Sequence, residues 1–212
     1  MKRVRKPVIL LVAAAALTLA AGAGAPLAAE EQVGGSGGSP FVYWPLADGN
    51  WWRLADADVE MVYSVSALAP GQFRVDLLLN NFVIQREFYH SDEAGWIATL
   101  REHPGGSFPL NPPQVFLKNP LVPGDEWTWE GEILPGFHMA ARFAVLEPEV
   151  IEAPAGQFLT LPVVATVTAE GESATVIRWF AEGVGIVRQQ EVVASGGQSV
   201  MIDMFLIDYE VQ

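Results

Sequence analysis

Hydrophobic and polar residues alternate along most of the chain after residue 40. The segment 72–77 is typical, because Phe73, Val75 and Leu77 are separated by polar side chains. A period of two gives a strand one apolar face and one solvated face. The same period recurs in four other segments, namely 59–66, 127–133, 137–145 and 159–168. No segment carries a sustained helical pattern, so the chain is predicted to be all-β.

Short turn sequences separate these alternating segments. Asp48-Gly49, Pro70-Gly71, Asn80-Asn81 and Pro123-Gly124 are examples, and such pairs reverse the chain between strands. About twelve strands with hairpin-length connections point to an antiparallel sandwich, barrel or open half-barrel. Of these we expect the sandwich or the open half-barrel.

One stretch departs from the alternation. Residues 103–124 hold six of the fifteen prolines and show no clear period. Proline lacks the N–H group that a sheet ladder needs, and long loops in compact domains are usually functional. The apolar residues Phe108 and Phe116 favour a packed loop. We therefore expect a flap over one end of the sheet.

Three sequence matches occur twice, in the same order. Pro45-Leu46-x-x-Gly49-x-x-Trp52 recurs as Pro120-Leu121-x-x-Gly124-x-x-Trp127. Likewise Gly71-Gln72-Phe73 recurs as Gly156-Gln157-Phe158, and Tyr89-x-x-Asp92-x-x-Gly95 as Trp179-x-x-Glu182-x-x-Gly185. Ordered matches indicate an internal repeat. We expect two diverged halves, about 41–110 and 111–212, in a single β-rich domain spanning 41–212.

The second-half motifs also carry a family resemblance. Pro120-Leu121-x-x-Gly124-x-x-Trp127-x-Trp129, Pro154-Ala155-Gly156-x-Phe158 and Trp179-Phe180-Ala181-x-Gly183-Val184-Gly185 resemble an uncharacterised group of secreted bacterial envelope proteins, often lipid-anchored, with a β-rich fold. That group is distantly similar to the lipoprotein-carrier half-barrels. The resemblance implies a curved sheet that holds an apolar ligand, and it implies no catalytic residues. This chain differs from the anchored members because it has no Cys.

The N-terminus reads as an export signal. Lys2 to Lys6 are basic, Pro7 to Ala25 are uncharged, and small residues precede Glu30. This pattern is typical of a cleavable signal peptide over 1–29, cut near Ala29. A cut after Ala25 and an uncleaved membrane anchor stay open as alternatives. Residues 30–40 are rich in Gly and Ser and predict a flexible tether. We expect a secreted or periplasmic protein of the cell envelope.

Charge and composition narrow the range of possible binding partners. The chain has 12 Lys and Arg against 25 Asp and Glu, a net charge of −13 at pH 7. Such an acidic protein repels nucleic acid and anionic membrane surfaces. The absence of Cys excludes disulfides, thiolate metal sites and Cys nucleophiles.

A search for catalytic or metal-binding residues finds no convincing set. The three histidines, His90, His103 and His138, lack zinc-site spacing. Asp203 stands out because it interrupts an apolar strand, where burial would raise its pKa. Its alternative is an outward or paired Asp near a sheet rim. We expect no metal, no cofactor and no enzymatic activity.

The leading functional hypothesis is an envelope protein that binds an apolar or amphipathic ligand, such as a lipid, in a sheet cavity under the proline-rich flap. Aromatic side chains suit such cavities. A carbohydrate or cell-wall binding module with exposed Trp platforms for polysaccharide is the alternative, and a secreted hydrolase is the second alternative. The candidate ligand-binding residues are Trp44, Trp51, Trp96, Phe108, Phe116 and Asp203.

Overall fold

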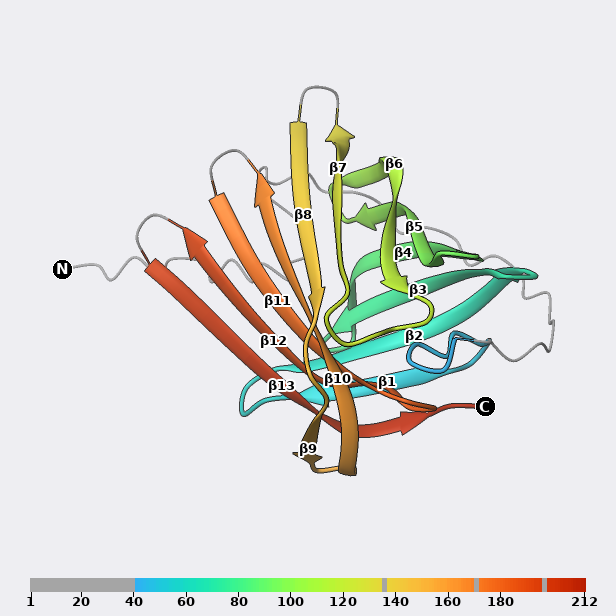
Figure 1. Ribbon diagram of the computed structural model, residues 1–212, viewed down its shortest axis with the longest axis vertical. Coiled ribbons are helices and arrows are strands. Elements are labelled where there is room, and N and C mark those ends of the chain that lie inside the picture. Colours follow the sequence, from blue (N-terminus) through green and yellow to red (C-terminus); the bar gives the residue numbers. More distant parts are fainter. Residues whose placement is uncertain (1–40, 135–136, 170–171, 196–197) are drawn as a thin grey trace.

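The computed structural model describes residues 41–134, 137–169, 172–195 and 198–212. Within these ranges the chain forms thirteen β-strands and no helix (Figure 1). The strands are β1 (Trp51–Ala55), β2 (Glu60–Ala69), β3 (Gln72–Leu79), β4 (Phe82–Asp92), β5 (Gly95–His103), β6 (Gly106–Lys118), β7 (Glu126–Leu134), β8 (Phe137–Val145), β9 (Glu149–Ala153), β10 (Gly156–Ala169), β11 (Glu172–Ala181), β12 (Gly185–Ser195) and β13 (Gln198–Glu210). The expected signal peptide (1–29) and tether (30–40) lie outside the described residues. Over the described ranges, no helix has the length and hydropathy of a membrane span.

Twelve of these strands close into a ring of antiparallel neighbours. Strands β1 to β8 follow one another, β10 pairs with both β8 and β11, and β13 pairs with β1. The prediction of an all-β antiparallel fold is confirmed. The expectation of a sandwich or open half-barrel is wrong, because the β10–β11 ladder joins the two ends of the sheet and makes a closed barrel.

Strand β9 is the one described strand outside the ring. It pairs only with β10, over Gly156–Thr160. Leu146 N–H donates to the Pro162 carbonyl at 2.9 Å, so β9 continues β8 along the same edge of β10. Figure 1 shows the β9–β10 hairpin extending past the lower ends of the neighbouring strands.

The proline-rich stretch forms a strand rather than the expected flap. β6 pairs with β5 along much of its length, and with β7 through one residue pair, Asn111 and Glu132. Pro112 and Pro113 fall where the register with β5 shifts, between the Ala98–Gln114 and Leu100–Pro109 pairs. A proline there removes no ladder hydrogen bond, so it is compatible with a strand.

The interior of the ring is filled at one end by the segment that precedes β1. Trp44 is 1% exposed and stacks on Trp52 with ring centroids 4.7 Å apart. Its carbonyl accepts a hydrogen bond from Trp96 Nε1 at 2.8 Å, and Gly183 N–H donates to the Val42 carbonyl at 2.7 Å. Residues 41–50 therefore act as a plug against the β4–β5 and β11–β12 turns.

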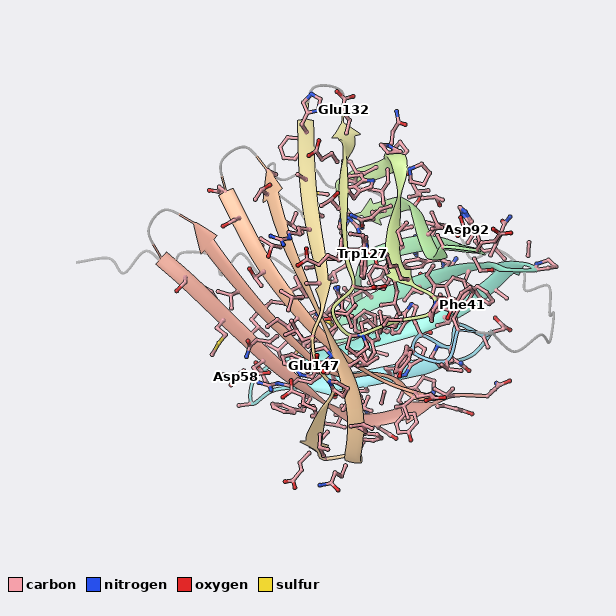
Figure 2. All side chains as sticks on the ribbon, in the orientation of Figure 1. Phe41, Asp58, Asp92, Trp127, Glu132 and Glu147 are labelled. Carbon is pink, nitrogen blue, oxygen red and sulfur yellow. The ribbon has the colours of Figure 1, made fainter. Side chains whose placement is uncertain are left out.

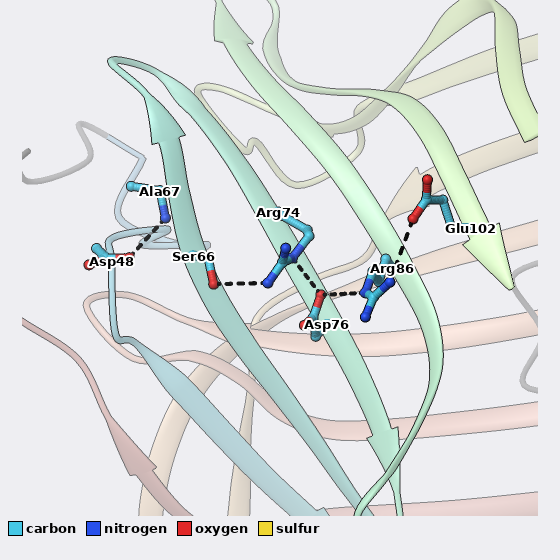
Figure 3. Close-up of polar contacts among 7 residues, drawn as sticks. All are labelled: Asp48, Ser66, Ala67, Arg74, Asp76, Arg86 and Glu102. Carbon is cyan, nitrogen blue, oxygen red and sulfur yellow. Dashed lines mark hydrogen bonds and ion pairs between the residues drawn. The ribbon is translucent and has the colours of Figure 1, made fainter. Parts of the chain in front are cut away.

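The outer face of β2 to β5 carries charged side chains (Figure 3). Asp76 lies 2.8 Å from Arg74 and 3.6 Å from Arg86, and Arg86 lies 3.9 Å from Glu102. The Asp76–Arg86 and Arg86–Glu102 pairs link adjacent strands across the solvated face, whereas Arg74 and Asp76 both lie on β3. Ion pairs of this kind contribute little to the free energy of unfolding, and they mainly keep the outer face of the sheet hydrated.

Candidate functional site

A groove lies where β10 runs past the end of β11. The ladder between the two strands ends at the pair Thr160 and Ala181, whereas β10 begins four residues earlier, at Gly156. Over 156–159, therefore, no strand of the described chain pairs with the edge of β10 that faces β11. We call the resulting hollow the β10 groove.

Four segments surround the β10 groove, one of them the β8–β9 connection at Pro148. Its volume is about 350 Å³, and its walls include Phe158 and Leu159 from β10, Glu182 and Val184 from the β11–β12 turn, and Tyr43 from the plug. Ligand sites in proteins start at about this size. The groove is thus large enough for a small molecule or for part of a longer one.

The groove has an apolar rim. Leu159 is 68% exposed, and Val150, on the neighbouring strand β9, is 55% exposed. Exposed apolar side chains beside a hollow are typical of ligand-binding surfaces. Phe158 is partly buried and packs edge-on against Tyr209, with ring centroids 6.3 Å apart.

One charged side chain contributes to the electrostatics of the groove. Burial raises the pKa of Tyr43, and the negative charge of Glu182 raises it further. The Tyr43 hydroxyl is therefore neutral at physiological pH. The negative charge of the Glu182 carboxylate acts on it across the groove. A hydroxyl and a carboxylate provide hydrogen-bond acceptors on a wall that combines apolar side chains with the polar Gln157 and Thr160.

The hairpin that forms one wall is held in place by hydrogen bonds. Trp179 Nε1 donates to the Glu149 carboxylate, and Thr160 Oγ1 donates to the Glu149 carbonyl at 2.8 Å. Ala155 N–H donates to the Leu206 carbonyl at 3.1 Å, which ties the hairpin turn to β13. The groove is therefore preformed by the fold.

A second hollow of about 280 Å³ lies along β7, β8 and β10, beside Glu130, His138 and Thr168. His138 lies 3.3 Å from Glu132 and is largely exposed. Figure 2 shows Glu132 near the upper end of β7. Apart from Met139, the side chains that line this hollow are short or polar. The hollow therefore offers less apolar surface than the β10 groove.

The ring also contains a buried polar cluster that the sequence analysis missed. Arg101 donates through Nε to Glu87 and through Nη2 to Gln114, at 2.8 and 2.7 Å. Tyr89 donates its hydroxyl proton to Glu87. Burial alone would raise the pKa of Glu87, but Arg101 and the Tyr89 hydrogen bond bring it below its ordinary value. Glu87 is therefore a charged, paired carboxylate inside the ring.

The other part of this cluster crosses the interior from β2 to β12. The side-chain carbonyl of Gln189 accepts hydrogen bonds from the Tyr63 hydroxyl and Arg178 Nε at 2.7 and 2.8 Å. The Gln189 amide donates to Glu191 at 2.6 Å. Burial raises the pKa of Tyr63 to about 12, so its hydroxyl stays a donor. With two Glu and two Arg the cluster is electrically balanced, and its hydrogen bonds fix the packing of the interior.

The sequence signal for this cluster is polar residues two apart on a strand. Gln85, Glu87 and Tyr89 share the inner face of β4, and Gln189 and Glu191 share that of β12. Alternation alone assigns such residues to the solvated face. Their burial can be recognised only in the folded structure, where the closed ring surrounds them.

The structure places the six sequence-predicted ligand residues in different environments. Trp44, Trp96 and Phe116 are core side chains, 1%, 1% and 7% exposed. Trp51 is partly exposed on β1 and donates to Glu210 at 3.1 Å. Phe108 lies on β6 beside His103, with ring centroids 5.6 Å apart. They do not form a common site, and none lines the β10 groove.

Asp203 is a paired residue on the outer face of β13. Arg188 donates to its two carboxylate oxygens at 2.8 and 2.6 Å. The guanidinium also lies over the rings of Trp179 and Phe205, 4.4 and 4.9 Å from their centroids. This bidentate, stacked geometry indicates that Asp203 has a structural role. Among the described residues, no group of three or more His, Asp or Glu could hold a metal ion.

Comparisons with known proteins find the following likenesses. No family model matches the chain, and no curated protein matches it. Two crystal structures resemble it over 80% of this chain and 99% of theirs, each at 14% identity. One, with a TM-score of 0.41, is described as a putative lipoprotein from Parabacteroides distasonis. The other, with a TM-score of 0.40, is described as a putative exported protein with a YmcC-like fold from Bacteroides fragilis.

Proposed function

We propose that this chain is an exported, non-enzymatic envelope protein that binds an apolar or amphipathic ligand in the β10 groove. The observation that carries the proposal is the apolar wall formed by the exposed Leu159 and the half-buried Phe158 beside a hollow of about 350 Å³. The β9–β10 hairpin borders the proposed ligand site, in place of the proline-rich segment that the sequence predicted as its cover. The basic and apolar N-terminal sequence supports export.

The alternative of a carbohydrate-binding module has less support. It requires aromatic platforms that face solvent, and Trp44 and Trp96 are buried in the core. Trp51 is partly exposed, but Arg53 lies 5.9 Å from its ring centroid and Glu210 bonds its indole. Neither contact favours a sugar over the apolar ligand.

Titration with an uncharged apolar fluorophore, N-phenyl-1-naphthylamine, tests the proposal. We expect saturable binding to the purified protein and at least about tenfold weaker binding to Leu159→Asp, because a carboxylate then enters the apolar wall. Val200→Asp is the matched control, since Val200 is 62% exposed, as Leu159 is 68% exposed, but lies away from the groove. Native mass spectrometry of protein purified from its host adds a second readout, for which we expect a bound adduct. Equal binding to both variants would overturn the proposal.

A further inference from the structure

The β10 groove combines apolar walls with hydrogen-bond acceptors. Glu182 is the only side chain charged at neutral pH among the described residues that line it. The whole chain carries a net charge of −13, which adds to the negative potential at the groove. An anionic head group would meet repulsion here, whereas a cationic one would meet a partner.

The unpaired edge of β10 adds backbone groups to the same wall. The Pro162 carbonyl accepts from Leu146 on the β8 side, and backbone groups of successive residues point to opposite edges of a strand. Leu159, an odd number of residues away, therefore directs its N–H and C=O groups toward the β11 side. The Leu159 carbonyl lies beside the last ladder pair, Thr160 and Ala181, and opposite Glu182, the first residue after β11. A carbonyl oxygen has two lone pairs, so it keeps acceptor capacity for a ligand beyond any bond to the Glu182 N–H.

The aromatic side chains suit the same class of ligand. Tyr43 and Phe158 line the groove together with Glu182, and aromatic faces attract ammonium groups. The Tyr43 hydroxyl is protonated at neutral pH, and burial and the charge of Glu182 raise its pKa further above the ordinary value. Its oxygen remains an acceptor, and it adds no negative charge that would compete with Glu182.

We propose that the ligand of the β10 groove carries a primary ammonium head group, which the Glu182 carboxylate, the Tyr43 hydroxyl and the Leu159 carbonyl accept, while its apolar tail covers Phe158 and Leu159. Three N–H donors on one nitrogen match three acceptors. A quaternary ammonium has the charge but no N–H donor and fits less well. This inference rests on the proposed function of the groove and specifies its ligand class.

Four probes with the same alkyl tail test the inference: dodecylamine, dodecyltrimethylammonium, dodecyl maltoside and laurate, each titrated by calorimetry below its critical micelle concentration. We expect dodecylamine to bind with one-to-one stoichiometry and about tenfold more tightly than the maltoside. The trimethylammonium probe should fall between them, and laurate should bind most weakly.

Two charge-matched variants separate recognition from general attraction to an acidic protein. Glu182→Gln should weaken dodecylamine binding about tenfold and leave dodecyl maltoside unchanged. Glu93→Gln removes one negative charge from an exposed turn outside the groove, and it should change neither affinity.

The outcomes distinguish the two proposals. Equal affinity for all four head groups, or an equal loss in both variants, would overturn the ammonium inference and leave groove binding intact. No binding of any probe to the purified protein would overturn groove binding itself, and the inference with it.

Discussion

The first and the last six strands of the ring meet at two seams that are built differently. At the β13–β1 seam, backbone pairing runs from Trp51–Glu210 to Ala55–Phe205. At the β6–β7 seam, a single residue pair, Asn111 and Glu132, joins the strands. The second seam is the one that holds the prolines of β6, so the missing N–H donors and the missing ladder coincide.

Indole side chains replace the ladder at the β6–β7 seam. Trp127 and Trp129 of β7 donate through Nε1 to the carbonyls of Val115 and Pro112 at 2.9 and 2.8 Å. Figure 2 shows Trp127 between β7 and β6, in the middle of the molecule. The comparison teaches that a proline-rich strand can close a ring when long side-chain donors reach its carbonyls.

The largest expected effect comes from removing one of these indoles. Trp129 is 5% exposed, and Trp129→Ala should cost about 3–5 kcal/mol through the cavity and the orphaned Pro112 carbonyl. Trp51→Ala at the β13–β1 seam should cost about 1 kcal/mol or less, because Trp51 is partly exposed and the ladder remains. Urea unfolding measures both. Similar losses at the two seams would refute the difference between them.

The next effect concerns Glu87, which joins β4 to β6 through Arg101 and Gln114. Glu87→Gln should lower the free energy of unfolding by about 3 kcal/mol at neutral pH, because it leaves the Arg101 charge buried without its partner.

The same residue predicts a pH dependence. The pKa of Glu87 is lower in the folded chain than its ordinary value of 4.5, so its stabilisation is present above that value and is lost as the pH falls through the folded pKa. Thermal melts between neutral pH and about pH 3 should show the gap between wild type and Glu87→Gln narrowing below pH 4.5. A constant gap would contradict the lowered pKa.

A smaller effect follows from adding one methyl group at the β6–β7 seam. A Cβ on Gly131 would lie 2.5 Å from the Trp129 ring and 2.6 Å from the Asn111 carbonyl oxygen. Gly131→Ala should therefore cost about 1–3 kcal/mol by overpacking. Gly105 is the matched control because nothing lies within 4 Å of its added Cβ, and Gly105→Ala should change stability by about 0.5 kcal/mol or less. Equal melting temperatures for the two variants would show that the seam is not tightly packed.

The smallest effect is expected at the β13–β1 seam. Arg53 and Asp208 pair at 2.9 Å across it, and their side chains are 38% and 53% exposed. Arg53→Ala should change the free energy of unfolding by about 0–1 kcal/mol, and any loss should shrink in salt. A loss above about 2 kcal/mol, insensitive to salt, would show that this seam also depends on side chains.

The sequence was sufficient to predict most strands, because their alternation is set by local residues. Phe73 and Val75 are indeed buried on β3. The sequence was insufficient to predict β6. A proline shows that a backbone N–H group is missing, but it does not show whether the sheet needs an N–H group at that position. It was also insufficient for the β10 groove, which depends on where β11 ends relative to β10. Leu159 reads as an ordinary strand residue until that end is known.

The internal repeat stays a proposal, and the turns of the two halves support it. Gly49 and Gly124 both have positive φ, 82° and 85°. Their N–H groups donate to the carbonyls of Val65 and Val145 at 3.1 and 2.9 Å. These equivalent bonds precede Trp52 and Trp127. The expected boundary near residue 110 falls inside β6. A boundary after Lys118, at the end of β6, would divide the ring between two strands instead of within one.

The position of β9 has a consequence for how this sheet could grow. Going once around a ring of antiparallel neighbours, the strand direction flips at every step and must return to its starting sense. Only an even number of strands permits that, and thirteen cannot close. One strand has to be left over, and β9 is that remainder. An insertion that keeps every neighbour in the ring antiparallel would have to add two strands, whereas a single added strand could extend the sheet outside the ring, as β9 does beside β10.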